Sequence, residues 1–151
     1  MNKSLYLAGP IGNCTFDEAV DWRRVAQQEL KKNGIDAYSP MRGKDYLDTG
    51  ERITGGSYPY ALSTSKGIMA RDYHDATTCD LLLVNLSIPH ERISIGTVME
   101  LGFAFAKQKL VVAIDSPVHQ YQKHPMVAEA VGFWAKDLTE AMEIARKVLN
   151  P

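Results

Sequence analysis

The chain has 151 residues and a formal net charge of −1, and 45% of its residues are hydrophobic and 23% charged. These values are typical of one domain, residues 1–151, which is large enough to form a core without disulfides or a structural metal. They argue against a basic nucleic-acid-binding surface, and no apolar run is long enough to span a membrane. Cys14 and Cys79 form no CxxC pair, as is typical of free thiols in a reducing compartment. We therefore expect a soluble cytoplasmic protein without nucleic-acid or membrane partners.

Short apolar runs that end at turn residues alternate along the chain with segments of helical period. In chain order, the pattern predicts a strand at 4–8, a helix at 15–33, a strand at 35–39, a helix at 63–77, a strand at 80–86, a helix at 97–107, a strand at 110–114, a short helix at 125–131, a strand at 133–135 and a helix at 137–149. Strands that alternate with helices indicate a parallel sheet with right-handed crossovers. We predict an α/β fold of the flavodoxin-like (Rossmann-like) type, with a five-stranded parallel sheet in the order 2-1-3-4-5 and helices on both faces.

Two segments of the first half carry further detail. The helix at 15–33 begins at a capping box formed by Thr15 and Glu18. Its predicted apolar stripe comprises Phe16, Ala19, Val20, Val25 and Leu30. Residues 43–61 contain several glycines and charges without a clear period. A loop of this length in a compact domain is typically a functional lid or a disordered segment.

Glu100 interrupts an apolar run that extends from Val98 to Ala106. A helix that is apolar on every side is buried, so a carboxylate in its first turn must be neutralised, hydrogen-bonded or used in chemistry. Thr97 and Glu100 fit a capping box, which predicts a structural role for the glutamate. The helix also follows the strongest predicted strand, on the side where open α/β sheets bind ligands. The two roles are compatible, because the helix dipole keeps a first-turn carboxylate ionised.

The loops after the first, third and fourth predicted strands share one edge of the sheet. The first loop, Gly9-Pro10-Ile11-Gly12, matches neither the dinucleotide-binding pattern nor the P-loop, so we predict no nucleotide cofactor. Its glycines indicate a tight turn or a close approach of the backbone to a ligand. The four histidines lack metal-ligand spacing and no G-x-S-x-G motif is present, so we predict neither a metal site nor a serine hydrolase.

Two acidic residues lie on the predicted helix at 63–77. Asp75 follows Arg71 by four residues, which is typical of a surface ion pair. Asp72 has no basic partner on its own helix and flanks a predicted apolar stripe. That stripe comprises Met69, Tyr73 and Ala76. An unpaired acid in this position is either used in chemistry or lies at a solvated helix edge.

Four short motifs occur along the chain: Tyr6-Leu7-Ala8-Gly9-Pro10, Arg71-Asp72, Cys79-Asp80 and Gly96-Thr97-x-x-Glu100-Leu101-Gly102. Together they resemble the nucleoside 2-deoxyribosyltransferase family, and the resemblance covers nearly the whole chain. The last motif is its most specific part. The resemblance implies an enzyme that breaks the N-glycosidic bond of a 2′-deoxynucleoside and passes the sugar to another base through a covalent deoxyribosyl–glutamate intermediate.

The resemblance implies roles for three residues. Glu100 matches the family's nucleophile, Tyr6 the tyrosine that orients it, and Asp72 the acid that manages protonation of the base. The chemistry agrees, because an anionic carboxylate beneath C1′ stabilises an oxocarbenium-like transition state and then captures it. The implied partners are a nucleoside or nucleotide and a free nucleobase, and no cofactor is implied.

Candidates for binding the substrate are Gly9, Pro10, Ser94, Gly96, Asn85 and Arg42. Ser94 stands six positions before Glu100, where the transferases usually have an acidic residue that contacts the sugar. A serine there is similar to the deoxynucleoside 5′-monophosphate N-glycosidases, in which it helps to hold the phosphate. Those hydrolases begin with G-S-x-R-G-G, whereas this chain lacks that serine and arginine. Transfer, hydrolysis of a monophosphate and non-catalytic nucleotide binding therefore stay open as alternatives.

The family's sites form at subunit contacts, and the helix at 97–107 has no polar stripe to offer to water. A helix of this kind in a small domain must be covered on its second face, either by the rest of the chain or by a partner. We expect a symmetric homo-oligomer, at least a dimer, with this helix at or near the interface and with shared active sites.

Overall fold

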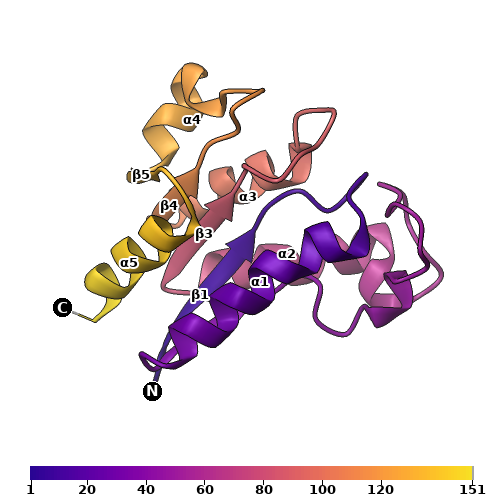
Figure 1. Cartoon of the computed structure of the whole chain (residues 1–151), viewed down its shortest axis with the longest axis horizontal. Coiled ribbons are helices and arrows are strands. Elements are labelled where there is room, and N and C mark those ends of the chain that lie inside the picture. The colour runs from indigo at the N-terminus through magenta and orange to yellow at the C-terminus, as the bar shows by residue number, and fades with distance from the viewer. Residues whose placement is uncertain (151) are drawn as a thin grey trace.

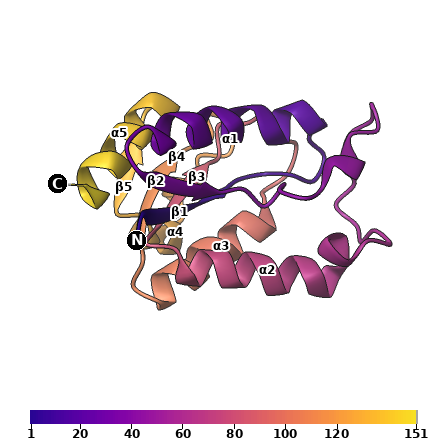
Figure 2. The ribbon, with the colours of Figure 1, turned by 90° about the horizontal axis from the view of Figure 1, so that it is seen from below.

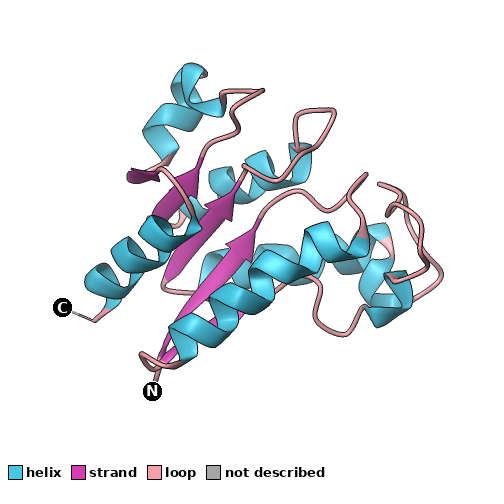
Figure 3. Ribbon diagram, viewed as in Figure 1, coloured by secondary structure: helices cyan, strands magenta, loops and turns pink. Residues whose placement is uncertain are grey.

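The computed structural model describes residues 1–150, which form a sheet of five parallel strands surrounded by helices (Figures 1 and 3). The strands are β1 (Lys3–Ala8), β2 (Ile35–Tyr38), β3 (Leu81–Asn85), β4 (Leu110–Ile114) and β5 (Phe133–Ala135). Their order in the sheet is β2-β1-β3-β4-β5, and every neighbouring pair is parallel. This is the predicted flavodoxin-like order. The direction in which successive strands are added to the sheet reverses after β2, so that β3 lies on the other side of β1.

Helices cover both faces of the sheet, as predicted. They are α1 (Phe16–Lys31), α2 (Ser65–Thr78), α3 (Ile95–Ala106), α4 (Pro125–Ala130) and α5 (Leu138–Leu149). Figure 2 shows α1 and α5 on one side of the strands and α2 and α3 on the other. No helix among residues 1–150 is both long and apolar enough to cross a membrane.

The core has two layers because side chains of a strand alternate between the faces of the sheet. In β1, Leu5 and Leu7 pack with residues of α1 and α5, while Tyr6 and Ala8 pack with residues of α2, α3 and α4. All four side chains are fully buried. The period of two therefore directs the Tyr6 ring to the α2–α3 side of the sheet.

In helix α1 the predicted capping box is confirmed, but the predicted apolar stripe is wrong at one position. The Thr15 hydroxyl accepts the Glu18 N–H, and the Glu18 carboxylate accepts the Thr15 N–H at 2.9 Å. Val25, which was expected in the core, is 47% exposed, whereas Arg23 is 1% exposed. Arg23 occupies the phase of the buried face, three residues after Val20, so position on the helix decided its burial rather than polarity.

Helix α3 begins two residues earlier than predicted. Its N-cap is Ser94 and its first residue is Ile95, so the capping box expected from Thr97 and Glu100 is wrong. Glu100 lies in the second turn, beyond the reach of a cap and of most of the helix dipole. The rest of the chain does not cover every side of the helix, because Ile95, Met99 and Phe105 are 73%, 42% and 58% exposed, so its cover by a partner chain stays a prediction.

Residues 43–61 are folded against the rest of the chain. They include the short 3₁₀ helix η1 (Asp45–Leu47) and lead into η2 (Ala61–Ser63). Leu47 and Ile53 are buried in a third apolar cluster with residues at the start of α1. The Ile53 N–H and carbonyl are also hydrogen-bonded to the loop after β1, at 2.7 Å each. Of the two interpretations of this segment, the structure therefore favours a packed functional element over disorder.

Candidate functional site

A cavity of about 840 Å³ opens at the carboxyl edge of β1 and β3, and we call it the Glu100 cavity. Its walls come from the loop after β1, the segment 44–63, one face of α2, the loop at 90–94 and the start of α3. Six predicted site residues line it: Gly9, Pro10, Asp72, Ser94, Gly96 and Glu100. Parallel topology brings them together, since the carboxyl ends of neighbouring strands meet at the same edge.

The carboxyl group of Glu100 lies in this cavity without a partner of its own. The residue is 8% exposed, and within residues 1–150 its Oε2 atom has no hydrogen-bond donor. Burial, together with the nearby charge of Asp72, raises the pKa of Glu100 to about 8. A buried carboxyl oxygen without a donor is costly for the fold, and groups with strongly shifted pKa values cluster at functional sites, so Glu100 is a candidate for one.

Asp72 brings a second carboxyl group to the same cavity. Its Oδ1 atom is buried and has no hydrogen-bond partner among the described residues. Burial raises the pKa of Asp72, while Lys44 and Arg71 oppose that shift. The apolar stripe that was expected beside it is buried only at Ala76, which is 2% exposed, whereas Met69 and Tyr73 are 46% and 42% exposed. Asp72 is therefore unpaired, as the sequence predicted, but it faces the cavity rather than a covered stripe.

Tyr6 lies behind Glu100, within the sheet. Its side chain is fully buried, and its hydroxyl makes no hydrogen bond of regular geometry within residues 1–150. Burial and the neighbouring carboxylates of Glu100 and Asp72 raise the pKa of Tyr6 well above its ordinary value. The phenol thus stays protonated and is able to donate to Glu100.

Arg42 does not line the cavity. Its guanidinium forms an ion pair with Asp75 at 2.7 Å, and Asp75 is 5% exposed. Arg71, the expected surface partner of Asp75, instead donates to the carbonyls of Arg42 and Pro40 at 2.9 and 2.5 Å. These contacts join the segment after β2 to α2, which is a structural role that helical spacing alone did not reveal.

Asn85 also lies outside the lining of the cavity. Its side chain is 3% exposed, and its Oδ1 atom accepts the Ser87 N–H at 3.0 Å and is 2.6 Å from the Ser87 hydroxyl oxygen. It shapes the turn after β3. Gly9 packs against this strand end so closely that a Cβ atom would lie 2.7 Å from the Asn85 carbonyl oxygen. Only glycine fits where the two strand ends meet beneath the cavity.

Arg23 supports the cavity from behind and was not predicted. Its guanidinium donates to the carbonyls of Leu7 at 3.0 Å, Ala19 at 2.5 Å and Gly9 at 3.1 Å, and no carboxylate of residues 1–150 forms an ion pair with it. Burial lowers the pKa of Arg23 to about 10, which leaves it charged at neutral pH. Its charge lowers the pKa of Glu100. The signal in the sequence was its place on the buried face of α1.

A hydrogen-bonded cluster holds the loop that forms the outer wall. The Tyr121 hydroxyl accepts the Ser94 N–H at 2.8 Å and lies 2.8 Å from His90 Nε2. The Ser94 hydroxyl in turn lies 2.7 Å from that of Thr97. The residue before α3 is thereby tied to the loop after β4. Spacing in the sequence could not reveal this, because Tyr121 is distant from both partners along the chain.

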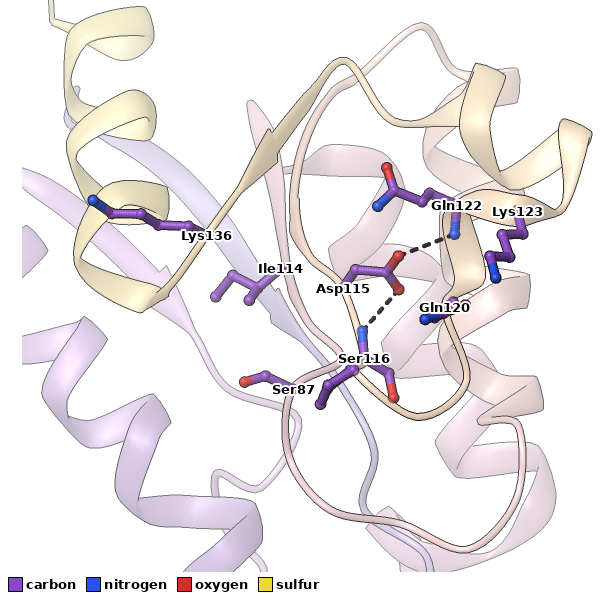
Figure 4. Close-up of a pocket in the computed structure, with 9 residues that line it drawn as sticks. Ser87, Ile114, Asp115, Ser116, Gln120, Gln122, Lys123 and Lys136 are labelled. Atoms are coloured by element: carbon purple, nitrogen blue, oxygen red, sulfur yellow. Dashed lines mark hydrogen bonds between the residues drawn. The ribbon is translucent and has the colours of Figure 1, made fainter.

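A second cavity of about 510 Å³ lies at the same edge, between β4 and the loops beside it (Figure 4), and we call it the Asp115 cavity. Its single carboxylate is fully used: Asp115 accepts the N–H groups of Ser116, Tyr121 and Gln122 at 2.7, 2.8 and 3.2 Å. Lys123 and Lys136 line opposite sides. No buried side-chain polar atom without a partner is found there among residues 1–150, so the Glu100 cavity is the stronger candidate.

The protein groups of the Glu100 cavity are acids, a phenol and cations rather than a set of metal ligands. Among residues 1–150, no three His, Cys, Asp or Glu side chains gather in a way that could hold a metal ion. Cys14 and Cys79 are both free and buried. The arrangement brings the carboxyl groups of Glu100 and Asp72 to the lining of one cavity.

Comparison with known proteins gives one family and several similar folds. The model of the family described as nucleoside 2-deoxyribosyltransferase matches residues 5–145. A 2-deoxyribosyltransferase from Bacillus psychrosaccharolyticus is similar over 98% of this chain and 91% of its own, with 18% identity and a TM-score of 0.64. No curated protein sequence gives a significant match.

Two other solved structures share the fold. A CMP N-glycosidase from Clostridium botulinum is similar over 97% of this chain and 100% of its own, with 16% identity and a TM-score of 0.57. A molybdenum cofactor carrier protein from Chlamydomonas reinhardtii is similar over 100% of both chains, with 17% identity and a TM-score of 0.60. At these identities the likeness concerns the fold alone.

Proposed function

Because the chain belongs to the nucleoside 2-deoxyribosyltransferase family, we propose that it cleaves the N-glycosidic bond of 2′-deoxynucleosides and transfers the deoxyribosyl group to another base. The observation that carries this proposal is the buried Glu100 carboxyl, which faces a cavity without a hydrogen-bond donor to its Oε2 atom from residues 1–150. A second carboxyl, that of Asp72, lines the same cavity. Glycosidic cleavage uses a pair of carboxyl groups in this way.

In the proposed reaction, a Glu100 carboxylate oxygen attacks C1′ of the sugar. The new C–O bond forms as the C1′–N bond breaks, and the electron pair of that bond goes to the departing base. Asp72, in its acid form, gives the base a proton. A nitrogen of the acceptor base then attacks C1′ and gives its proton to the Asp72 carboxylate, the ester to Glu100 breaks, and the glutamate regains its carboxylate.

The surroundings of Glu100 suit this role. Burial raises its pKa to about 8, so the anion is destabilised in this structure and is a better nucleophile once formed. Positive charge that develops on the sugar stabilises that anion. The Tyr6 phenol is able to donate to one carboxylate oxygen and so to orient the other towards C1′, while the charge of Arg23 limits the rise of the Glu100 pKa from behind.

Hydrolysis of a nucleoside 5′-monophosphate is the second candidate. Ser94 and the exposed Arg92 line the cavity near the first residues of α3, where N–H groups are available to an anion. In that reaction water takes the place of the acceptor base and attacks the same deoxyribosyl ester. The third candidate is binding without turnover, since a carrier protein also has this fold.

A panel of donors separates these candidates. Each 2′-deoxynucleoside and its 5′-monophosphate is incubated with and without an acceptor base, and products are followed by chromatography. Exchange of the base only when an acceptor is present supports transfer, whereas free base and sugar phosphate without an acceptor support the hydrolase.

Mass spectrometry of the protein after brief mixing with donor tests the role of Glu100 directly. We expect an added deoxyribosyl group on the peptide that contains Glu100. Binding of a donor without adduct, exchange or release of base contradicts the enzymatic proposal and supports the non-catalytic alternative.

A further inference from the structure

Lys44 is a buried cation in the wall of the Glu100 cavity. The residue is 5% exposed and lines the cavity together with Asp72. No ion pair within residues 1–150 includes its ammonium group. Lysine is rarely buried to this extent unless it is paired, because removing an ammonium group from water is costly.

The backbone around Lys44 is fixed, so the position of the side chain does not come from a loose loop. Gly43 has a φ of 74°, which permits a tight turn, and the Lys44 N–H donates to the Met41 carbonyl at 3.1 Å. Met41 is 4% exposed and belongs to the apolar cluster at the start of α1. The turn thus anchors Lys44 at the edge of the cavity.

The charged groups around Lys44 do not neutralise the positive charge of its ammonium group. Burial lowers the pKa of Lys44, and the positive charges of Arg71, Arg42 and Arg23 lower it further, while Asp72 raises it. The three guanidinium groups have acceptors of their own, whereas no ion pair within residues 1–150 includes the Lys44 ammonium group. A bound molecule that presents an acceptor atom here supplies the missing partner.

We propose that Lys44 determines base specificity, its ammonium group donating a hydrogen bond to an exocyclic carbonyl oxygen of the bound nucleobase. The inference rests on the proposed function, which places the base beside Asp72. The same wall carries Leu47, Ile53 and Ile68, whose apolar side chains suit the faces of a flat ring. With an oxo base, the ammonium group also stabilises the negative charge that this oxygen gains as the bond to C1′ breaks.

Two pairs of free bases test the contact without requiring turnover. Hypoxanthine and adenine differ by a 6-oxo in place of a 6-amino group, and cytosine carries a 2-oxo group that 4-aminopyrimidine lacks. We expect the wild-type protein to bind the oxo member of at least one pair more tightly in calorimetry. Lys44→Met should lose about 10- to 100-fold in affinity for that member and less than about 3-fold for the other, as expected for one charge-assisted hydrogen bond.

Matched variants separate the contact from a structural role. Lys44→Arg keeps the charge and should recover part of the preference, while Lys32→Met removes an exposed lysine at the end of α1 and should change neither affinity. Thermal unfolding of Lys44→Met shows whether the fold is kept. If the melting temperature of Lys44→Met falls sharply, the proposal is still tested by the preference of Lys44→Arg and of the wild-type protein for the oxo member of each pair.

Kinetics add a readout that depends on the proposed reaction. Lys44→Met should reduce kcat/KM for 2′-deoxyinosine about 10- to 100-fold but that for 2′-deoxyadenosine less than about 3-fold. Base binding that depends on Lys44 without cleavage of any donor contradicts the proposed function and supports the Lys44 contact. Equal losses for both members of each pair indicate that Lys44 acts through Asp72, and Lys44-dependent binding of inorganic phosphate indicates a phosphate site. Either result, or binding of no base, overturns the inference.

Discussion

Two acidic residues at the same edge of the sheet have opposite surroundings. Asp115, at the end of β4, accepts three backbone N–H groups and shapes the loop that follows it. Glu100, on α3, has a buried Oε2 atom with no donor from residues 1–150. A carboxylate with its acceptors filled stabilises a loop, whereas one without donors destabilises the fold and is available to a substrate. The comparison is the reason for which we place the proposed chemistry in the Glu100 cavity.

The largest effect is expected from Glu100→Gln. The amide has nearly the same shape but cannot act as the nucleophile, so base exchange should fall by at least about 10³-fold. Stability should stay equal or rise, because a buried carboxyl without donors is removed. Single-turnover assays and thermal unfolding measure the two quantities. Retained activity with lower stability would make Glu100 structural and reverse the comparison.

Asp72→Asn should slow cleavage by about 10²-fold, since the amide cannot give a proton to the departing base. The loss should be largest for bases that are poor leaving groups and smallest for those that leave readily as anions. A series of donors whose bases differ in acidity gives the slope of the rate loss against the acidity of the base. A uniform loss across the series would show that Asp72 positions the substrate instead.

Asp115→Asn is the matched substitution in the other cavity. It removes the charge and one of the acceptor oxygens that serve the loop after β4, and should lower the free energy of unfolding by about 1–2 kcal/mol. Base exchange should change less than about 3-fold. Denaturant titration and the exchange assay test this, and a large loss of activity at unchanged stability would place chemistry in the Asp115 cavity.

Stability should also depend on pH through Glu100. Its pKa is raised from 4.5 to about 8, so between these values the folded protein keeps a proton that the unfolded chain releases. The free energy of unfolding contributed by this group therefore falls as pH rises through that window, by about 1–3 kcal/mol for a buried charge without a partner. Glu100→Gln should lack this part of the decline. Urea titrations at pH 5.5 and 8.5 measure the free energy of unfolding of the two proteins. An equal decline between these pH values in both proteins would contradict the raised pKa of Glu100.

The smallest effect on the chemistry concerns the outer face of α3. The inner face carries Glu100, whereas Ile95, Met99 and Phe105 are exposed on the same helix. We predict that a second copy covers this face and helps to complete the site. Light scattering should give a mass of at least twice 16.8 kDa, and Phe105→Glu should reduce it and weaken activity. A fully active wild-type monomer would contradict both parts.

The elements of the fold were predictable because local signals and the fold agree. Short apolar runs that end at turn residues and their alternation with helices predicted all five strands and their order, and the capping box of Thr15 and Glu18 was confirmed. The sequence also singled out Glu100 as the one acid in an apolar run, and Asp72 as an acid without a basic residue three or four positions away on its helix. The false capping box at Thr97 shows the limit: the same letters fit a cap, but packing started the helix at Ile95.

Sequence by itself determined the family and the sheet order, and it singled out two acids, Asp72 and Glu100, that line the same cavity. Only the tertiary structure decided which charged side chains form ion pairs. Arg42 was expected to bind the substrate but pairs with buried Asp75, while Lys44 was not expected and lines the cavity without an ion pair within residues 1–150. Local pattern cannot distinguish these cases, because whether a charged group is paired depends on segments that are distant along the chain and meet only when the sheet forms.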